Sequence, residues 1–166
     1  MATIYISIGS NINPEVNFRT CSVALKQHFE QLIWSPIYRS VPVGMRGADF
    51  LNAVVSARTS LPVSAVVKLL KQMELNQGRE SDMHGFNSRT LDIDLLLYDQ
   101  LIVDTEELTL PHKELSNTAF VLVPMVDLQP TSKHPTTDQT YQDMLASCLY
   151  RQADFAAGLS KVTLEF

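Results

Sequence analysis

The apolar residues of this 166-residue chain recur at two spacings, and the order of those spacings limits the folds that it can adopt. Alternation by two residues predicts a strand, and recurrence at three and four residues predicts a helix. The resulting order is strand, helix, strand, strand, helix, strand, as in the ferredoxin-like split βαβ plan. We therefore expect an α+β fold with an antiparallel-rich sheet and helices packed on one face, which leaves the other face free for ligands. The expected strands cover residues 2–10, 31–40, 50–58 and 88–98, and the expected helices cover residues 13–29 and 60–77.

Local signals set the ends of several elements. Asn13 can cap the first helix, and Glu15 lies near the positive end of its dipole. Pro36 cannot donate a hydrogen bond to a neighbouring strand, so we expect an edge strand or a bulge there. Residues 40–49 are rich in proline and glycine, which predicts a long tip between two hairpin strands. Gly78 follows the second helix as a C-terminal cap.

The second half of the chain carries weaker signals. We expect a short helix near residues 117–123 and another from about residue 139, with an undefined tail. The chain is 45% hydrophobic, which is enough for one sizeable core, and its length is that of one domain. We therefore expect a single domain over residues 1–166.

The composition narrows the classes of partner. A formal net charge of −5 and a pI near 5.3 argue against a general affinity for nucleic acid or an anionic membrane. Neither a signal peptide nor an apolar run of membrane-spanning length occurs, and Cys21 and Cys148 form no disulfide framework or metal-binding spacing. We expect a cytoplasmic monomer that binds small molecules.

Two aspartates interrupt the apolar strand SRTLDIDLLLY. Alternation places Asp92 and Asp94 on one face with Leu96 and Tyr98, and it places the odd-numbered apolar residues on the opposite face. Neighbouring like charges repel, so a metal, a cationic partner or full solvation has to offset them. A strand end open to water is the simplest alternative. We favour Mg²⁺, because few oxygen ligands on an open site suit an ion shared with substrate phosphates.

The chain carries five motifs that occur together in one enzyme family: SRTLDIDLLLY, IGSN at 8–11, DFLNAV at 49–54, ELNQGR at 74–79 and LPH at 110–112. With them the chain resembles the 6-hydroxymethyl-7,8-dihydropterin pyrophosphokinase family. The resemblance runs from Thr3 to Pro130, and the interval between Arg79 and Arg89 matches the family's spacing. It implies transfer of pyrophosphate from ATP to a pterin alcohol in folate biosynthesis, with Asp92 and Asp94 holding two Mg²⁺ ions on the ATP phosphates.

Residues of one strand suit a flat heterocycle. Phe50 and Asn52 share a strand face, where an aromatic plane lies beside an amide that both donates and accepts hydrogen bonds. Taken singly, such residues more often serve packing. The resemblance adds Phe120 as a second stacking aromatic. The pterin-binding residues that it implies are Gly9, Ser40, Val43, Phe50, Asn52 and Phe120.

The residues expected to bind the nucleotide are those that the family resemblance implies. Arg89 directly precedes the metal strand and could bind phosphate through two parallel hydrogen bonds. Glu74 also matches the family, either as a catalytic group or as a structural partner of Arg79. The implied catalytic residues are Asp92, Asp94, Arg89, Arg79 and His112, and the implied ATP contacts are Arg89, Leu95, Thr109 and His112.

The chain departs from the family on this nucleotide side. A charge-assisted phosphate contact contributes about 1.5–3 kcal/mol, so missing arginines would weaken ATP capture. Lys113, His84 or Arg46 could substitute for them. The departures are Ser81 and Thr118 at usually basic positions, Lys113 at a frequently aromatic one, and Glu107 at a basic position near the adenine.

Two other functions stay open beside the enzyme. A paralogue that keeps the pterin pocket but transfers pyrophosphate weakly or not at all would explain the one-sided departures. RNA binding through the free sheet face is disfavoured by the net charge and by the lack of a basic, aromatic strand motif. We expect ATP and 6-hydroxymethyl-7,8-dihydropterin as partners, and neither nucleic acid nor a membrane.

Overall fold

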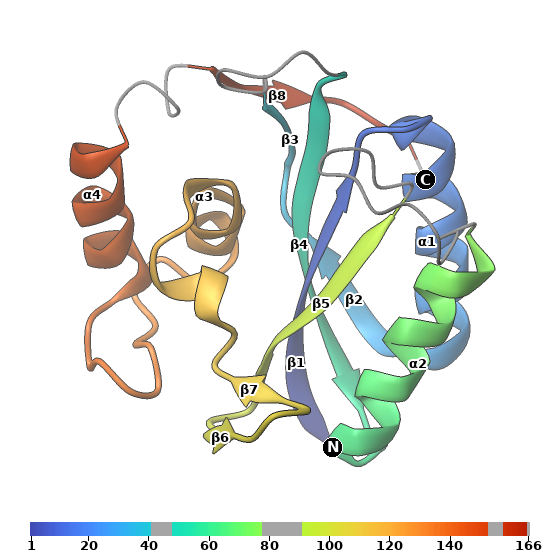
Figure 1. The fold of residues 1–166 in the computed structure, drawn as a ribbon, viewed down its shortest axis with the longest axis horizontal. Coiled ribbons are helices and arrows are strands. Elements are labelled where there is room, and N and C mark those ends of the chain that lie inside the picture. Colours follow the sequence, from blue (N-terminus) through green and yellow to red (C-terminus); the bar gives the residue numbers. More distant parts are fainter. Residues whose placement is uncertain (41–47, 78–90, 153–157, 166) are drawn as a thin grey trace.

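The computed structural model describes residues 1–40, 48–77, 91–152 and 158–165 (Figure 1). These residues form an α+β fold in which a large antiparallel sheet lies between two pairs of helices. The predicted fold class is confirmed. In chain order the elements are β1 (Ala2–Ser10), α1 (Pro14–His28), β2 (Glu30–Trp34), β3 (Ile37–Ser40), β4 (Phe50–Thr59), α2 (Val63–Asn76), β5 (Asp92–Tyr98), β6 (Val103–Asp104), β7 (Thr109–Leu110), the 3-10 helix η1 (Lys113–Ser116), α3 (Ala119–Leu128), α4 (Tyr141–Arg151) and β8 (Leu159–Val162).

The large sheet has the strand order β5-β1-β4-β3-β8, and β2 pairs with β4 as well. All of these pairings are antiparallel. The sequence predicts an edge strand or a bulge at Pro36. In the structure Pro36 lies between β2 and β3, and both of these strands pair with β4. β8 pairs with β3 and lies in the tail that the sequence left undefined.

Helices α1 and α2 cover one face of the sheet (Figure 1). Ile4, Ile6 and Ile8 of β1 are at most 1% exposed and pack in one core with Phe18 of α1 and Leu70 of α2. This core confirms the predicted alternation of β1 and the packing of the first two helices on one face.

Helix α3 lies against the opposite face, and α4 packs on the outer side of α3 (Figure 1). Val54, Leu96 and Leu97 of the sheet pack there with Leu122 and Met125 of α3. The prediction that this face stays free of helices is therefore wrong for the part that α3 covers. The physical reason is that β4 and β5 carry apolar side chains on both faces, and both faces gain stability from burial.

Several helix ends differ from the expected ones. Asn13 takes a left-handed conformation with φ 45°, and its side chain makes no capping hydrogen bond to α1. Helix α2 begins after Pro62, and the expected cap Gly78 lies outside the described residues. Helix α3 runs past residue 123 to Leu128 with Pro124 inside it. Burial of its apolar side chains outweighs the backbone hydrogen bond that the proline removes.

Candidate active site

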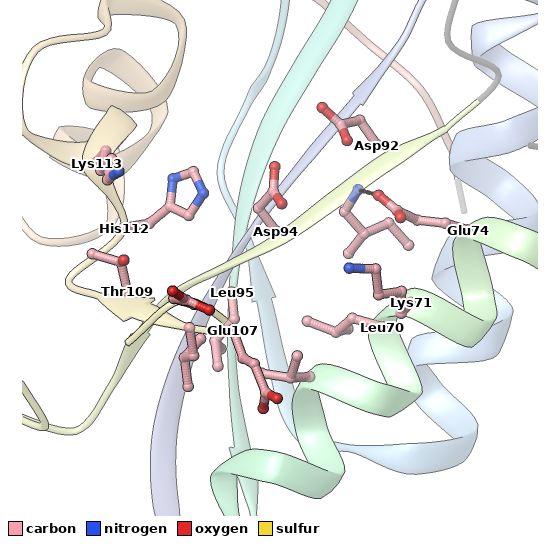
Figure 2. Close-up of a pocket in the computed structure, with 14 residues that line it drawn as sticks. Leu70, Lys71, Glu74, Asp92, Asp94, Leu95, Glu107, Thr109, His112 and Lys113 are labelled. Carbon is pink, nitrogen blue, oxygen red and sulfur yellow. Dashed lines mark hydrogen bonds between the residues drawn. The ribbon is translucent and has the colours of Figure 1, made fainter. Parts of the chain in front are cut away.

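Asp92 and Asp94 project from the same face of β5, as alternation predicts (Figure 2). Ile93, between them, is 4% exposed and packs into the core beneath α1 and α2. Gly9 and Ser7 of β1 lie opposite the two aspartates. Both aspartates are partly exposed, so a ligand can reach the pair.

Strand β5 contains a bulge just beyond the aspartates. Leu96 faces no residue of β1 in the strand pairing. Leu96 and Leu97 both pack in the core beneath α3 and α4, whereas Tyr98 packs in the other core and donates its hydroxyl proton to Leu61 O at 2.9 Å. The predictions that Tyr98 shares the aspartate face and that Leu97 lies opposite are wrong, because the extra residue reverses the alternation.

A row of polar residues crosses the sheet beside the aspartates. Asp92 pairs with Gly9, Gly9 with Asn52, Asn52 with Tyr38, and Tyr38 with Lys161. Residues that oppose each other in an antiparallel pair face the same side of the sheet. The row therefore places the Asp92 carboxylate on the edge strand β5 and the Asn52 amide on the central strand β4, with only Gly9 between them.

Gly9, Ser40 and Phe50, three of the pterin-binding residues predicted from the sequence, lie around Asn52. Its side-chain amide donates to Ser40 Oγ at 3.2 Å, and both residues are buried. A Cβ on Gly9 would lie 3.1 Å from Asn52 Oδ1, so the glycine leaves room for this amide. Phe50 lies two residues before Asn52 on β4 and pairs with Ser40. Phe120 lies at the start of α3, half-buried against the core on the same side of the sheet.

A pocket of ≈ 410 Å³ lies along β5, between α2 and the segment that follows β6 (Figure 2). It brings the predicted nucleotide contacts Leu95, Thr109 and His112 together with both aspartates. Its lining carries more carboxylates than ammonium groups, which favours a cation or a cation–phosphate complex over a bare anion. The lining residues are Val67, Leu70, Lys71, Glu74, Asp92, Ile93, Asp94, Leu95, Glu106, Glu107, Leu108, Thr109, His112 and Lys113.

Backbone and side-chain contacts fix His112 beside β5. Its amide donates to Leu96 O at 2.9 Å, and its Nδ1 accepts from the Glu114 amide at 3.4 Å, which caps η1. With Nδ1 used as an acceptor, the neutral ring carries its proton on Nε2. That N–H is then available to an anion in the pocket.

The donor set fits a shared divalent cation better than a closed metal cage. Among the described residues, no group of three or more His, Cys, Asp or Glu side chains is arranged to hold a metal ion. Asp92 and Asp94 supply two adjacent carboxylates on a partly exposed face. Mg²⁺ is commonly held by one or two carboxylates and completed by water and substrate phosphates.

The remaining predicted residues divide between the pocket lining, the start of α3 and the part of the chain that is not described. Lys113 and Glu107, two of the departures noted in the sequence, both line the pocket. Thr118, a third, is the residue before α3. The residues that lie outside the described part of the chain are Val43, Arg46, Arg79, Ser81, His84 and Arg89.

Three residues near the site were missed by sequence reasoning. Lys71 lines the pocket one helical turn before Glu74, and their spacing of three residues was a usable signal. The Tyr38 hydroxyl donates to the Asp127 carboxylate and so links β3 to α3. Alternation places Tyr38 on the face of Ser40, but no local pattern pairs it with a residue 89 positions away.

Comparison with protein families gives one match that covers most of the chain. Residues 5–130 match the model of the family 7,8-dihydro-6-hydroxymethylpterin-pyrophosphokinase (HPPK). The 2-amino-4-hydroxy-6-hydroxymethyldihydropteridine pyrophosphokinase of Haemophilus influenzae is 35% identical over 132 residues, which cover 77% of this chain and 82% of that protein. The Bacillus subtilis protein of the same name is 35% identical over 84% of this chain and 86% of its own length.

Solved structures give the same fold. A Plasmodium falciparum HPPK-DHPS crystal structure with pterin and p-hydrobenzoate superposes with a TM-score of 0.75 over 98% of this chain, at 12% identity. The chain spans 48% of that longer protein. At this identity the likeness supports the fold only.

Proposed function

The chain belongs to the 7,8-dihydro-6-hydroxymethylpterin-pyrophosphokinase family, and we propose that the sheet face and pocket described above carry out pyrophosphate transfer from ATP to 6-hydroxymethyl-7,8-dihydropterin. AMP is the second product, and the reaction belongs to folate biosynthesis. The observation that carries this assignment is that Asp92 and Asp94 share one pocket with Leu95, Thr109 and His112.

Asp92 and Asp94 are the proposed metal ligands. Two Mg²⁺ ions held there would neutralise the charge on the ATP phosphates. The other residues of the site position the two substrates, because phosphoryl-type transfer needs the attacking and leaving oxygens in line. The His112 Nε2–H donates to a phosphate oxygen in this proposal. Arg79 and Arg89 take phosphate-binding roles on the basis of the sequence motif alone.

The pterin is proposed to lie over the polar row of the sheet. Asn52, held by Ser40, offers its amide to the edge of the ring, and Phe50 and Phe120 stack on its two faces. Gly9 keeps the space beside the amide open. Val43 is proposed from the motif as a further ring-edge contact. The row ends at Asp92, and we propose that the ring binds with its hydroxymethyl group toward that residue.

The direct test is AMP formation by the purified protein with Mg²⁺, ATP and the reduced pterin alcohol. We expect turnover in the wild type and none in Asp92→Asn or Asp94→Asn. Thermal stability without metal should stay the same or rise in both variants, because each loses a like-charge repulsion. No AMP above an Asp94→Ala control would overturn the assignment, and marked destabilisation of both apo variants would indicate a structural ion-pair role.

A pterin-binding protein with weak transfer is the second candidate. Glu107 and Lys113 line the pocket proposed for the nucleotide, while the pterin side keeps its amide and both aromatics. Titration calorimetry distinguishes the two candidates. Tight pterin binding without nucleotide binding at millimolar ATP favours the binding protein, and ordered binding with nucleotide first favours the enzyme.

We further propose that the chain works as one domain and as a monomer in the cytoplasm. Both cysteines are free and buried, which suits a reducing compartment. Among the described residues, no helix has the length and apolarity needed to cross a membrane.

A further inference from the structure

Glu74 of α2 is the most deeply buried carboxylate in the described part of the chain, at 4% exposed. It continues the apolar stripe of Val66, Leu70 and Met73, which face the core. A buried carboxylate is costly unless its charge is paired or hydrogen-bonded. Glu74 also lies in the last turn of α2, where the helix dipole disfavours negative charge. An apolar residue would satisfy packing at this position, so packing alone does not account for a glutamate.

One hydrogen bond of Glu74 is made to the residue between the two proposed metal ligands. Its Oε1 accepts from the Ile93 backbone amide at 2.8 Å (Figure 2). Among the described strands, β5 pairs with β1 on one side only, so β5 is an edge of the large sheet. The Glu74 carboxylate satisfies an amide on the open edge of β5, where a further strand would otherwise supply a carbonyl.

This contact holds the β5 backbone from the side opposite β1. Ile93 pairs with Ile8, and its side chain is fixed in the core, so a second hold on its amide leaves the backbone little freedom to tilt. The Asp92 and Asp94 side chains leave the chain immediately on either side of Ile93. A shift of the Ile93 peptide would therefore change the distance and angle between the two carboxylates.

We propose that Glu74 is a positioning residue, whose side-chain oxygen holds the Ile93 amide so that Asp92 and Asp94 present their carboxylates to a divalent cation at a fixed spacing. The proposal rests on the metal-binding role given to the two aspartates above. It assigns the effect to the acceptor oxygen of Glu74. A glutamine, which keeps an acceptor oxygen at the same reach, should therefore replace it.

The test compares three substitutions by Mn²⁺ titration in the presence of a non-hydrolysable ATP analogue. We expect Glu74→Met, which keeps the length and loses the acceptor, to weaken Mn²⁺ binding by about tenfold, as one lost positioning hydrogen bond to a charged group would. Glu74→Gln should stay within about threefold of the wild type. Met73→Leu, next to Glu74 on the core-facing side of α2 and outside the pocket lining, should leave Mn²⁺ binding unchanged. Pterin affinity should be the same in all three.

Amide hydrogen exchange of the metal-free protein gives a second readout. Exchange at Ile93 should accelerate in Glu74→Met and stay slow in Glu74→Gln, while Asp94, whose amide faces β1 in the strand pairing, keeps its protection. Equal loss of Mn²⁺ binding in the Gln and Met variants would overturn the proposal in favour of a role for charge. Loss of both Mn²⁺ and pterin binding in Glu74→Met would reduce Glu74 to a general structural residue. If Asp94→Asn leaves Mn²⁺ binding intact, the result contradicts the metal-binding role proposed for the two aspartates, which is distinct from a failure of the Glu74 proposal.

Discussion

Gly9 of β1 lies directly opposite Asn52 of β4, and a Cβ at Gly9 would come within 3.1 Å of Asn52 Oδ1. Glycine inside a strand costs stability and often marks a close approach by another group. Here the approaching group is the amide that we propose to bind the pterin. The amide is also held from the other side by Ser40. Asn52 therefore cannot move away without losing that hydrogen bond.

We predict that Gly9→Ala weakens pterin binding by about three- to tenfold, the range of one distorted hydrogen bond. ATP binding should change little, because the nucleotide pocket lies beyond β5. Calorimetry with each ligand measures the difference. The control is a double-mutant cycle with Asn52→Ala: Gly9→Ala should cost nothing further once the amide is gone. Additive losses would mean that Gly9 acts by another route.

The phase of the aspartate strand could be predicted from the sequence up to the bulge and not beyond it. Asp92, Ile93 and Asp94 alternate polar and apolar, and the structure keeps that alternation. Leu95, Leu96 and Leu97 are all apolar, so no residue type marks where the alternation reverses. Both faces of the sheet are covered by an apolar core there, so a leucine is buried whichever face it points to. The apolar pattern therefore does not reveal the one-residue shift in register.

The short strands and the long-range contacts could not be predicted from the sequence, for a different reason. β8 has residues Leu159–Val162, of which none is fully buried, and its stability depends on pairing with β3 rather than on its own pattern. β6 and β7 have two residues each. The pocket could be anticipated only through family motifs, because its walls come from α2, β5 and residues 106–113, and no local periodicity brings these together.

The bond between Tyr38 and Asp127 should stabilise α3 on the sheet. Tyr38 is 7% exposed, and burial together with the Asp127 carboxylate raises the pKa of its phenol, so the hydroxyl remains a donor at physiological pH. We predict that Tyr38→Phe lowers the free energy of unfolding by about 1 kcal/mol, which is about 2–4 °C in Tm for a chain of this size. Calorimetric melting measures it.

Tyr150 provides the matched control, since it is 91% exposed on α4. Tyr150→Phe should leave Tm unchanged. Because α3 carries Phe120 at its start, Tyr38→Phe should also weaken pterin binding at a temperature where the variant is fully folded. An unchanged pterin affinity would mean that the Tyr38–Asp127 hydrogen bond contributes to stability but not to pterin binding.

Glu107 should oppose nucleotide binding. Its exposed carboxylate lines the pocket proposed for a polyphosphate. We predict that Glu107→Lys tightens ATP binding by about two- to fivefold at low salt, the size of an exposed charge effect, and that the gain shrinks as ionic strength rises. Glu30→Lys on β2 makes the same charge change outside the pocket and should have no such effect. Tighter ATP binding in both variants, or in neither, would contradict a position of Glu107 beside the bound nucleotide.

A buried histidine connects the segment after α3 to η1. His134 is 3% exposed and packs edge-on against Tyr141 at 6.2 Å. Its Nδ1 accepts from the Thr136 amide at 3.3 Å, and its Nε2 lies 3.4 Å from Ser116 Oγ. The neutral ring with its proton on Nε2 satisfies both contacts. Protonation of Nδ1 would cost the hydrogen bond from the Thr136 amide, and burial disfavours the charged ring.

Burial lowers the pKa of His134, and stability should therefore depend on pH. The unfolded chain takes up a proton at His134 below about pH 6.5, whereas the folded chain takes it up only at a lower pH. Between these two values the unfolded state binds more protons, so the free energy of unfolding falls as the pH decreases. Urea unfolding at a series of pH values should show this slope in the wild type and a smaller one in His134→Gln. An unchanged slope in His134→Gln would mean that the folded protein does not exclude the proton from this ring.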